Sequence, residues 1–363
     1  MEGLREKNQL KKYLYSIAIL LFLNVLMLIF STHQQMVETF YGMRIYNLIS
    51  FLQHFFFSLF PFSVGDIVYI SVIILLIYIL VIAIKLLINR NFRSFLFLIL
   101  RFFAGMLSAI FLFYFLWGLN YFRQPASKRL NLLEYNFTIA ELKNVTSKLI
   151  DSANICRSRI TNMDMQQTNL QIYNTSLMAI KKLGNQSADF KSYSPRVKSS
   201  FITYLLNYMG TAGYFNPFTG EAQINYQMPI FDKPVVACHE MSHQMGFGAE
   251  DEANFVGFLA ASGSGERLSR YSAYHLAVDE FMHALYARDS LSFKELKPRI
   301  SKAVKNDFLT ERLYWSSYQN SLNNITGIFY NNFLKANNQP QGLNTYNRMV
   351  LLLMAKYKKQ NDF

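Results

Sequence analysis

Cysteine is scarce in this sequence, and positive charge is not clustered. Only two of the 363 residues are cysteines, Cys156 and Cys238, which is too few for a disulfide framework. We expect Cys238 to be a small buried apolar residue, and nothing in the sequence supports a bridge to Cys156. Although the net charge is +13, no dense basic run with interleaved aromatic residues occurs. Nucleic acid is therefore not an expected partner.

The sequence also lacks internal repeats and long low-complexity linkers. Its first 119 residues hold little charge, with nine Lys or Arg and four Asp or Glu. The remaining residues are again net basic, and a basic domain beside an anionic lipid bilayer is the simplest interpretation of that balance. We therefore divide the chain into a membrane region at 1–119 and a second domain at 120–363.

Three long apolar runs predict transmembrane helices at about residues 13–30, 67–88 and 95–117. The first run follows a basic segment, is too long for the apolar core of a usual signal peptide and precedes no cleavage pattern. We interpret it as an uncleaved anchor. The stretch at 45–62 is rich in aromatic residues but interrupted by polar ones, and there we expect an interfacial or partly inserted helix.

The distribution of Lys and Arg predicts the orientation of these spans. Basic residues gather before the first span and around the loop at 89–94, between the second and third. The positive-inside rule makes both segments cytoplasmic. Three spans then place residues 120–363 outside the cytoplasm.

The region after residue 119 is predicted to be mostly helical. Thr138 and Glu141 have the spacing of a capping box, which predicts a helix to about residue 157. The stretch at 213–225 is typical of a turn that leads into a short strand. Further helices are predicted at 166–183, 271–287, 293–305 and 310–333, and a mixed segment with a strand at 197–209.

The segment at 235–244, with the sequence VVACHEMSHQ, contains the pattern His-Glu-x-x-His in a run that favours helix. His239 and His243 are four residues apart, so they lie on one helical face and can bind one metal ion together. Glu240 lies beside them and is placed to activate water. Asp232 is the predicted N-cap of this helix.

A pattern with three fixed positions also arises by chance, and the alternative is a helix with two surface histidines. The apolar residues at 235–237 favour a buried helix. Buried histidines and a buried glutamate need partners, because an unpaired polar group is costly away from water. A metal ion supplies such a partner.

A catalytic zinc site normally has a third protein ligand. Position 249 is alanine, so neither the histidine of metzincins nor the aspartate of aspartate-zincins is present. A glutamate on the following helix remains, the gluzincin arrangement, and Glu250 and Glu252 are the candidates. We prefer Glu252, which opens a Glu-Ala segment similar to the ligand helix of thermolysin-like enzymes. Glu250 and Asp251 would then orient a histidine N–H, although acids also favour a helix N-terminus without any metal.

In zincins an edge strand beside the active-site helix pairs with an extended peptide substrate. Glu221, Ala222 and Gln223 are our candidates for that strand, and an ordinary strand near the core is the alternative.

Peptide hydrolysis also needs a hydrogen-bond donor for the oxyanion, often Tyr or His. Tyr346 and Tyr330 are the preferred candidates, with Tyr274 and His275 as further choices. His275 and His283 are eight apart on one predicted helix. We expect both histidines to be packing or surface residues and not metal ligands.

The chain resembles an uncharacterised family of zincin-like membrane proteins found in Bacteroidota and some Firmicutes. The resemblance covers nearly the whole chain and implies a membrane-anchored metallopeptidase-like protein of a bacterial envelope, in the inner (cytoplasmic) membrane. It points to His239, Glu240 and His243, leaves the choice between Glu250 and Glu252 open, and implies no substrate. The motifs that carry it are PFSVGD at 61–66, WGLNYFR at 117–123, NPFTGEA at 216–222 and the segment at 239–255.

Together these patterns predict a mostly α protein. Three transmembrane helices precede a zincin-like α+β domain with a small sheet and a helical C-terminal half. The expected function is zinc-dependent hydrolysis of peptide bonds in the envelope, with Zn²⁺ as cofactor, Glu240 as base and the lipid bilayer and a peptide or protein substrate as partners. A catalytically silent sensor or structural envelope protein is the alternative.

Overall fold

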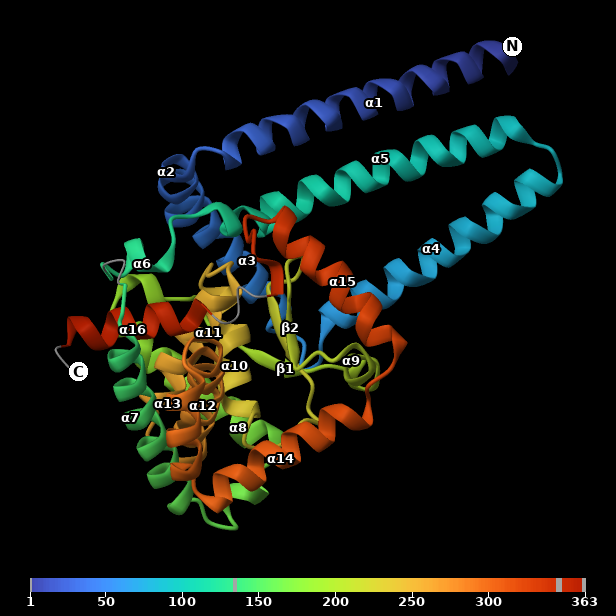
Figure 1. The fold of residues 1–363 in the computed structure, drawn as a ribbon. Coiled ribbons are helices and arrows are strands. Elements are labelled where there is room, and N and C mark those ends of the chain that lie inside the picture. Colours follow the sequence, from blue (N-terminus) through green and yellow to red (C-terminus); the bar gives the residue numbers. More distant parts are fainter. Residues whose placement is uncertain (1, 133–135, 344–347, 361–363) are drawn as a thin grey trace.

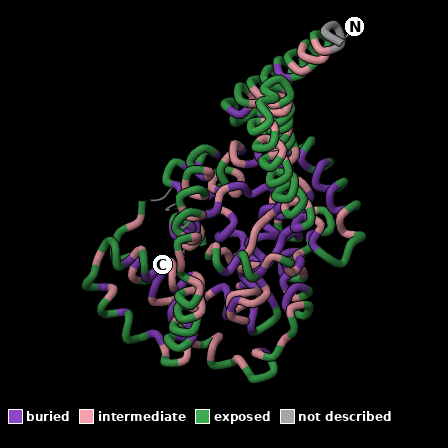
Figure 2. Tube along the Cα trace, turned by 90° about the vertical axis from the view of Figure 1, so that its right-hand side faces the viewer, coloured by how far each residue is buried: buried purple, intermediate pink, exposed green. Residues whose placement is uncertain are grey.

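Three long helices project from one side of the molecule, away from a body that contains most of the other elements (Figure 1). The computed structural model describes residues 2–132, 136–343 and 348–360. Helix α1 (Glu2–Ser31) runs beside α5 (Phe92–Leu116), and α4 (Val64–Ile88) joins α5 through a short loop at their far end. Their residues are mostly exposed, whereas buried residues gather in the body (Figure 2).

Segments of 26, 25 and 25 residues in α1, α4 and α5 are long and apolar enough to cross a membrane. The prediction of three candidate spans is therefore confirmed, and their exposed apolar surfaces support membrane association. The predicted limits are close to the helices, although α1 begins well before residue 13 because its basic start is also helical.

A short helical segment links α1 to α4. It comprises α2 (Gln34–Met36), the π-helix η1 (Val37–Ile45) and α3 (Tyr46–Phe57). Helix α3 has 12 residues, which is too short to span a bilayer. It buries Gln53 and His54, which contact the main-chain oxygens of Pro217 and Gly220, and it exposes aromatic residues on its other side. The helix is therefore amphipathic, and its interfacial position stays a prediction.

The sheet is small and has three strands in the order β1-β3-β2. Strands β2 (Gly213–Asn216) and β3 (Glu221–Ile224) form an antiparallel hairpin, and β1 (Val197–Ser199) pairs with β3 in parallel. The Asn216 side chain accepts hydrogen bonds from the next turn, and Gly220 adopts a positive φ of 67° that favours glycine.

Helices form the remainder of the body, and α8, α10, α11 and α12 pack into its main core together with α7. The capping box predicted at Thr138 is present at the start of α7. The bounds of these helices are α6 (Ala126–Arg129), α7 (Ile139–Ser158), α8 (Asn169–Gly184), α9 (Thr203–Met209), α10 (Lys233–Gln244), α11 (Glu250–Ser262), α12 (Arg267–Arg288), α13 (Ser290–Leu296), α14 (Lys302–Ser317), α15 (Ser321–Ala336) and α16 (Met349–Lys359), with 3₁₀ turns η2 (Gly118–Phe122), η3 (Asp164–Gln166), η4 (Ala188–Phe190) and η5 (Lys297–Arg299).

Two predictions for the body need correction. The helix expected at 293–305 is interrupted at η5, because Pro298 cannot donate a main-chain hydrogen bond and Ser301 caps a new helix. The helix expected at 310–333 is broken before Ser321, where Asn320 forms a capping box. The mixed segment predicted at 197–209 is confirmed, with a strand of three residues followed by α9.

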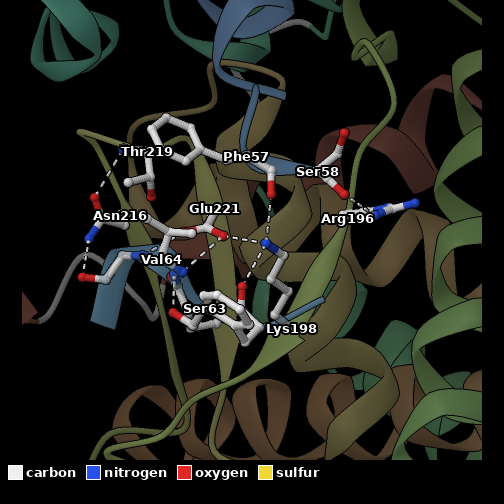
Figure 3. A network of polar contacts seen from close by, with 12 residues as sticks. Phe57, Ser58, Ser63, Val64, Arg196, Lys198, Asn216, Thr219 and Glu221 are labelled. Atoms are coloured by element: carbon white, nitrogen blue, oxygen red, sulfur yellow. Dashed lines mark hydrogen bonds and ion pairs between the residues drawn. The ribbon is translucent and has the colours of Figure 1, made fainter. Parts of the chain in front are cut away.

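Buried polar contacts join the start of α4 to the sheet (Figure 3). The Glu221 carboxylate accepts hydrogen bonds from the main-chain N–H groups of Val64 and Gly65, where the dipole of α4 favours negative charge. It also pairs with Lys198, whose ammonium donates to the main-chain oxygens of Phe57 and Phe62. The start of α4 is therefore fixed to the body by buried charge.

We predict that Glu221→Ala destabilises the protein strongly, because it leaves the Lys198 ammonium unpaired. The two side chains are only 7% and 5% exposed, and breaking such a buried pair costs about 3–5 kcal/mol. Glu295→Ala is the matched control, since Glu295 is 63% exposed and pairs with Lys143 at the surface. That change should cost under about 1 kcal/mol. Denaturant titration in detergent measures both, and equal losses would contradict the buried role.

Candidate metal centre

The two histidines of the His-Glu-x-x-His pattern lie on the buried face of α10, as predicted. His239, Glu240 and His243 each present a donor atom, and these three atoms lie within 4.8 Å of one another. Gly246, with a positive φ of 80°, follows the end of the helix. Asp232 is the N-cap residue of the helix, as predicted, but its side chain accepts no capping hydrogen bond.

Glu250 is the acid that the fold brings to the histidines. Its Oε2 lies 3.2 Å from His239 Nε2 and 3.9 Å from His243 Nε2. The rotation of α11 about its own axis is the reason, since Glu250 lies on the side of its first turn that faces α10. This placement corrects our preference for Glu252. The Glu252 carboxylate instead accepts a hydrogen bond from the Ala126 N–H at 2.6 Å, and it forms no ion pair with either histidine.

The other ring nitrogens of the histidines are held by oxygen acceptors. His239 Nδ1 lies 2.8 Å from the Asn254 side-chain oxygen, and His243 Nδ1 lies 2.7 Å from the main-chain oxygen of Phe247. Because these oxygens only accept, both Nδ1 atoms must donate, and in the neutral rings both Nε2 atoms present lone pairs.

Asp251, which we expected to orient a histidine, lies instead 4.0 Å from Arg348.

The Nε2 atoms of His239 and His243 therefore both face Glu250 Oε2, at 3.2 and 3.9 Å, and a Glu240 oxygen lies within 4.8 Å of a ring nitrogen of each histidine. Three acceptors so close repel one another unless a proton or a cation lies between them. Two imidazole nitrogens and one carboxylate oxygen are the donor set of a zinc site such as that of thermolysin. These residues fit a divalent metal ion, with Asn254 and the Phe247 carbonyl orienting the rings.

The pKa values of the buried histidines and glutamates at this centre are shifted in different directions. Burial lowers the pKa of His243 to about 4, so this ring is neutral near pH 7. For His239 burial acts in the same direction, but its hydrogen bond to Glu250 and the charges of Glu240 and Glu250 raise its pKa to about 9. Burial raises the pKa of Glu240 to about 8, and contact with both histidines lowers the pKa of Glu250 to about 2.

Two tyrosines lie near the carboxylates. The Tyr330 hydroxyl donates to Glu250 Oε1 at 2.6 Å, so this predicted oxyanion candidate does lie at the site. Tyr121 was missed, because the sequence indicates only an interfacial aromatic residue there. Burial raises its pKa strongly, and the nearby charges of Glu250 and Glu240 raise it further. Tyr346 lies outside the described residues, and Tyr274 and His275 form no contact with the two histidines.

The predicted substrate strand is placed differently from our expectation. Glu221, Ala222 and Gln223 lie in β3, which has a neighbour on each side and so has no free edge. Strand β2 is an edge strand within the described part of the chain, and it approaches the site. A Cβ atom at Gly213 would lie 2.8 Å from Glu240 Oε1, and the Phe215 ring lies 6.1 Å from that of His243.

The end of α10 is held by residues of the membrane region. The main-chain oxygen of His243 accepts hydrogen bonds from Trp117 Nε1 at 3.1 Å and from the Tyr46 hydroxyl at 3.2 Å. The Trp117 ring also packs edge-on against the His243 ring.

Both cysteines are free, and Cys238 is buried as predicted.

Comparison with known proteins identifies a family. Residues 41–354 match the family model described as a protein of unknown function, DUF3810. The chain belongs to the DUF3810 family. No curated protein and no solved structure matches it. The match to DUF3810 covers the short helix α3, two of the three candidate spans and the whole of α10 and α11.

We predict that the two neighbouring glutamates have different effects on retained zinc. Glu250→Gln should abolish stoichiometric zinc after dialysis, because a neutral amide is a poor ligand. Glu252→Gln should retain the metal, since its side-chain oxygen still accepts from Ala126. Metal analysis of the purified full-length variants measures this difference. Loss of zinc from the Glu252 variant alone would restore our first assignment.

Proposed function

We propose that this DUF3810 protein is a membrane-anchored zinc metallopeptidase of the bacterial envelope. The observation that carries the proposal is the convergence of His239 Nε2, His243 Nε2 and Glu250 Oε2, with the Glu240 carboxylate within 4.8 Å of the two ring donors. A structural metal site needs no such carboxylate beside its ligands, whereas hydrolysis does.

His239, His243 and Glu250 would hold the ion, and Zn²⁺ would supply Lewis acidity toward a peptide carbonyl and toward water. Glu240 is the general base. It takes one proton from the water whose oxygen bonds to the carbonyl carbon, and it returns that proton to the departing amine nitrogen as the C–N bond breaks. The burial that raises its pKa favours this exchange near neutral pH.

The hydroxyl groups of Tyr330 and Tyr121 are the candidates for stabilising the oxyanion. Tyr330 already donates to Glu250, so it would have to leave this bond or act through it. Tyr121 lies close enough for both Glu240 and Glu250 to shift its pKa. In a buried site such a donor is worth several kcal/mol, about 2.7–4 for one hydrogen bond to an oxyanion.

An extended peptide is the substrate class that the surroundings of Glu240 favour. The free edge of β2 offers main-chain hydrogen bonds to such a chain. Gly213, at the start of β2, leaves room for the Glu240 carboxylate, because any larger residue would press on it. β2 therefore takes the role that we first gave to β3.

The candidate spans and the distribution of basic residues give the proposed location. Three apolar helices anchor the protein in the bilayer, and the basic N-terminus and the loop at 89–94 are cytoplasmic under the positive-inside rule. The metal centre then lies on the extracytoplasmic side of the inner membrane. Since Tyr46 and Trp117 both contact α10, the site lies close to the membrane region.

Glu240→Gln tests the enzyme proposal directly. The amide keeps the size of the side chain but cannot accept the proton, so zinc and fold should be retained while peptide hydrolysis falls by about 10²–10⁴-fold. Cleavage of a peptide library by the full-length protein in detergent measures this. Undiminished function of this variant, for instance full rescue of a deletion phenotype, would favour a sensor or structural protein.

Gly213→Ala should also lower hydrolysis, because its Cβ would lie 2.8 Å from both Glu240 Oε1 and the Gln223 main-chain oxygen. Gly265→Ala is the matched control, since nothing lies within 4 Å of the added atom. The kinetic parameters of both variants on the same peptide provide the comparison. Equal activity of the two would contradict a close approach of β2 to the base.

The orientation is tested with a reporter that is active only outside the cytoplasm. Fused after residue 363 it should be active, and inserted in the loop at 89–94 it should be inactive, because basic loops stay inside. The reverse pattern would place the metal centre in the cytoplasm.

A further inference from the structure

A second group of metal-donor residues lies near the N-terminal end of α10. Asp232 precedes that helix, His275 belongs to α12 and Glu311 belongs to α14. One donor atom from each residue lies within 4.8 Å of the other two. Asp232 and His239 are separated by about two helical turns, or roughly 10 Å along the axis, so this group is distinct from the first centre. That separation is also well beyond the ~4 Å of a shared two-metal site.

Two side-chain atoms of this group are buried without a hydrogen-bond partner among the described residues. His275 is only 3% exposed, and its Nε2 has no partner. Oδ2 of Asp232 is also buried and unpartnered. The one contact between them, from His275 Nδ1 to Asp232 Oδ1, measures 3.5 Å and is too long for a good hydrogen bond. Buried polar atoms without partners are rare in folded proteins and indicate a missing partner.

Acidic charge around these residues exceeds the basic charge that could neutralise it. The negative charges of Asp279 and Asp307 lie near that of Asp232, and Asp307 is itself paired with Arg157. Burial and these neighbours raise the pKa of Asp232 well above its usual value, and burial together with Asp279 raises the pKa of Glu311 to about 7. Arg312 offsets part of the charge on Glu311, and the Lys233 ammonium binds Asn169.

His275 does not supply the missing positive charge. Burial lowers its pKa to about 4, which disfavours the charged ring. Its ring stacks on Phe308 of α14 at 4.1 Å between centroids, which fixes it between α12 and α14. A neutral imidazole among carboxylates is the arrangement of a metal ligand and not that of an ion pair.

We propose that Asp232, His275 and Glu311 bind a second divalent transition-metal ion, of the zinc or manganese class. One imidazole nitrogen with two carboxylates suits these ions better than Mg²⁺ or Ca²⁺, which prefer oxygen ligands alone. Three elements that are distant in sequence would be joined by the ion. Its role is therefore structural, since it ties α12 and α14 to the start of the helix that carries His239 and Glu240.

The full-length protein, freed of metal with a chelator and reloaded with Zn²⁺ or Mn²⁺ alone, tests the proposal. We expect two ions per chain in the wild type and one in Glu311→Gln, a conservative change at a partly exposed residue. His283→Ala is the matched control, because this exposed histidine on α12 also lies beside Asp279. It should retain both ions.

A background that lacks the first centre separates the two sites. His239→Ala combined with His243→Ala should still bind one ion, and adding that ion should raise the melting temperature. Introducing Glu311→Gln into this background should remove both the ion and the rise in melting temperature. A wild type and a Glu311→Gln variant with the same metal content would overturn the second site, whatever the result for the first.

Discussion

The candidate centre depends on the close approach of α10 and α11. A Cβ atom added at Gly257 would lie 3.0 Å from the main-chain nitrogen of His239 and 3.1 Å from its Cα, so the two helices are in contact through their backbones. This contact brings Glu250 to the Nε2 atoms of both histidines and Asn254 to Nδ1 of His239. A larger separation would leave His239 Nδ1 and the Asn254 side chain without their hydrogen bond, at a cost of about 1–3 kcal/mol for each buried group, and would leave Glu250 only the Tyr330 hydroxyl.

The opposite end of α10 links this contact to the membrane region. The last carbonyl groups of the helix accept hydrogen bonds from Tyr46 and Trp117, and that of His243 also accepts from the Gly246 N–H. Nearby, the buried Arg123 guanidinium donates two hydrogen bonds to the Glu38 carboxylate. The motifs at 61–66, 117–123 and 216–222 therefore hold the apolar helices, the sheet and α10 in one arrangement. They supply no ligand of the candidate centre.

The sequence was sufficient to predict the features that have local causes. The helical spacing of His239 and His243, the capping box at Thr138 and the apolar runs of the spans each depend on neighbouring residues. The choice between Glu250 and Glu252 depends on how α11 is rotated against α10, which is a tertiary property. A signal for it was present, because Glu250, Asn254 and Gly257 follow the i, i+4, i+7 spacing of one helical face. The central position of β3 required the pairing with β1, a strand of only three residues.

The central claim is that His239, His243 and Glu250 hold one metal ion. Diffraction from crystals of the zinc-loaded full-length protein, recorded on both sides of the zinc absorption edge, tests it most directly. We expect an anomalous peak about 2.0–2.2 Å from Nε2 of each histidine and from a Glu250 carboxylate oxygen. A zinc-loaded crystal with no peak among these three residues, or with the peak bound by Glu252 instead of Glu250, would contradict it.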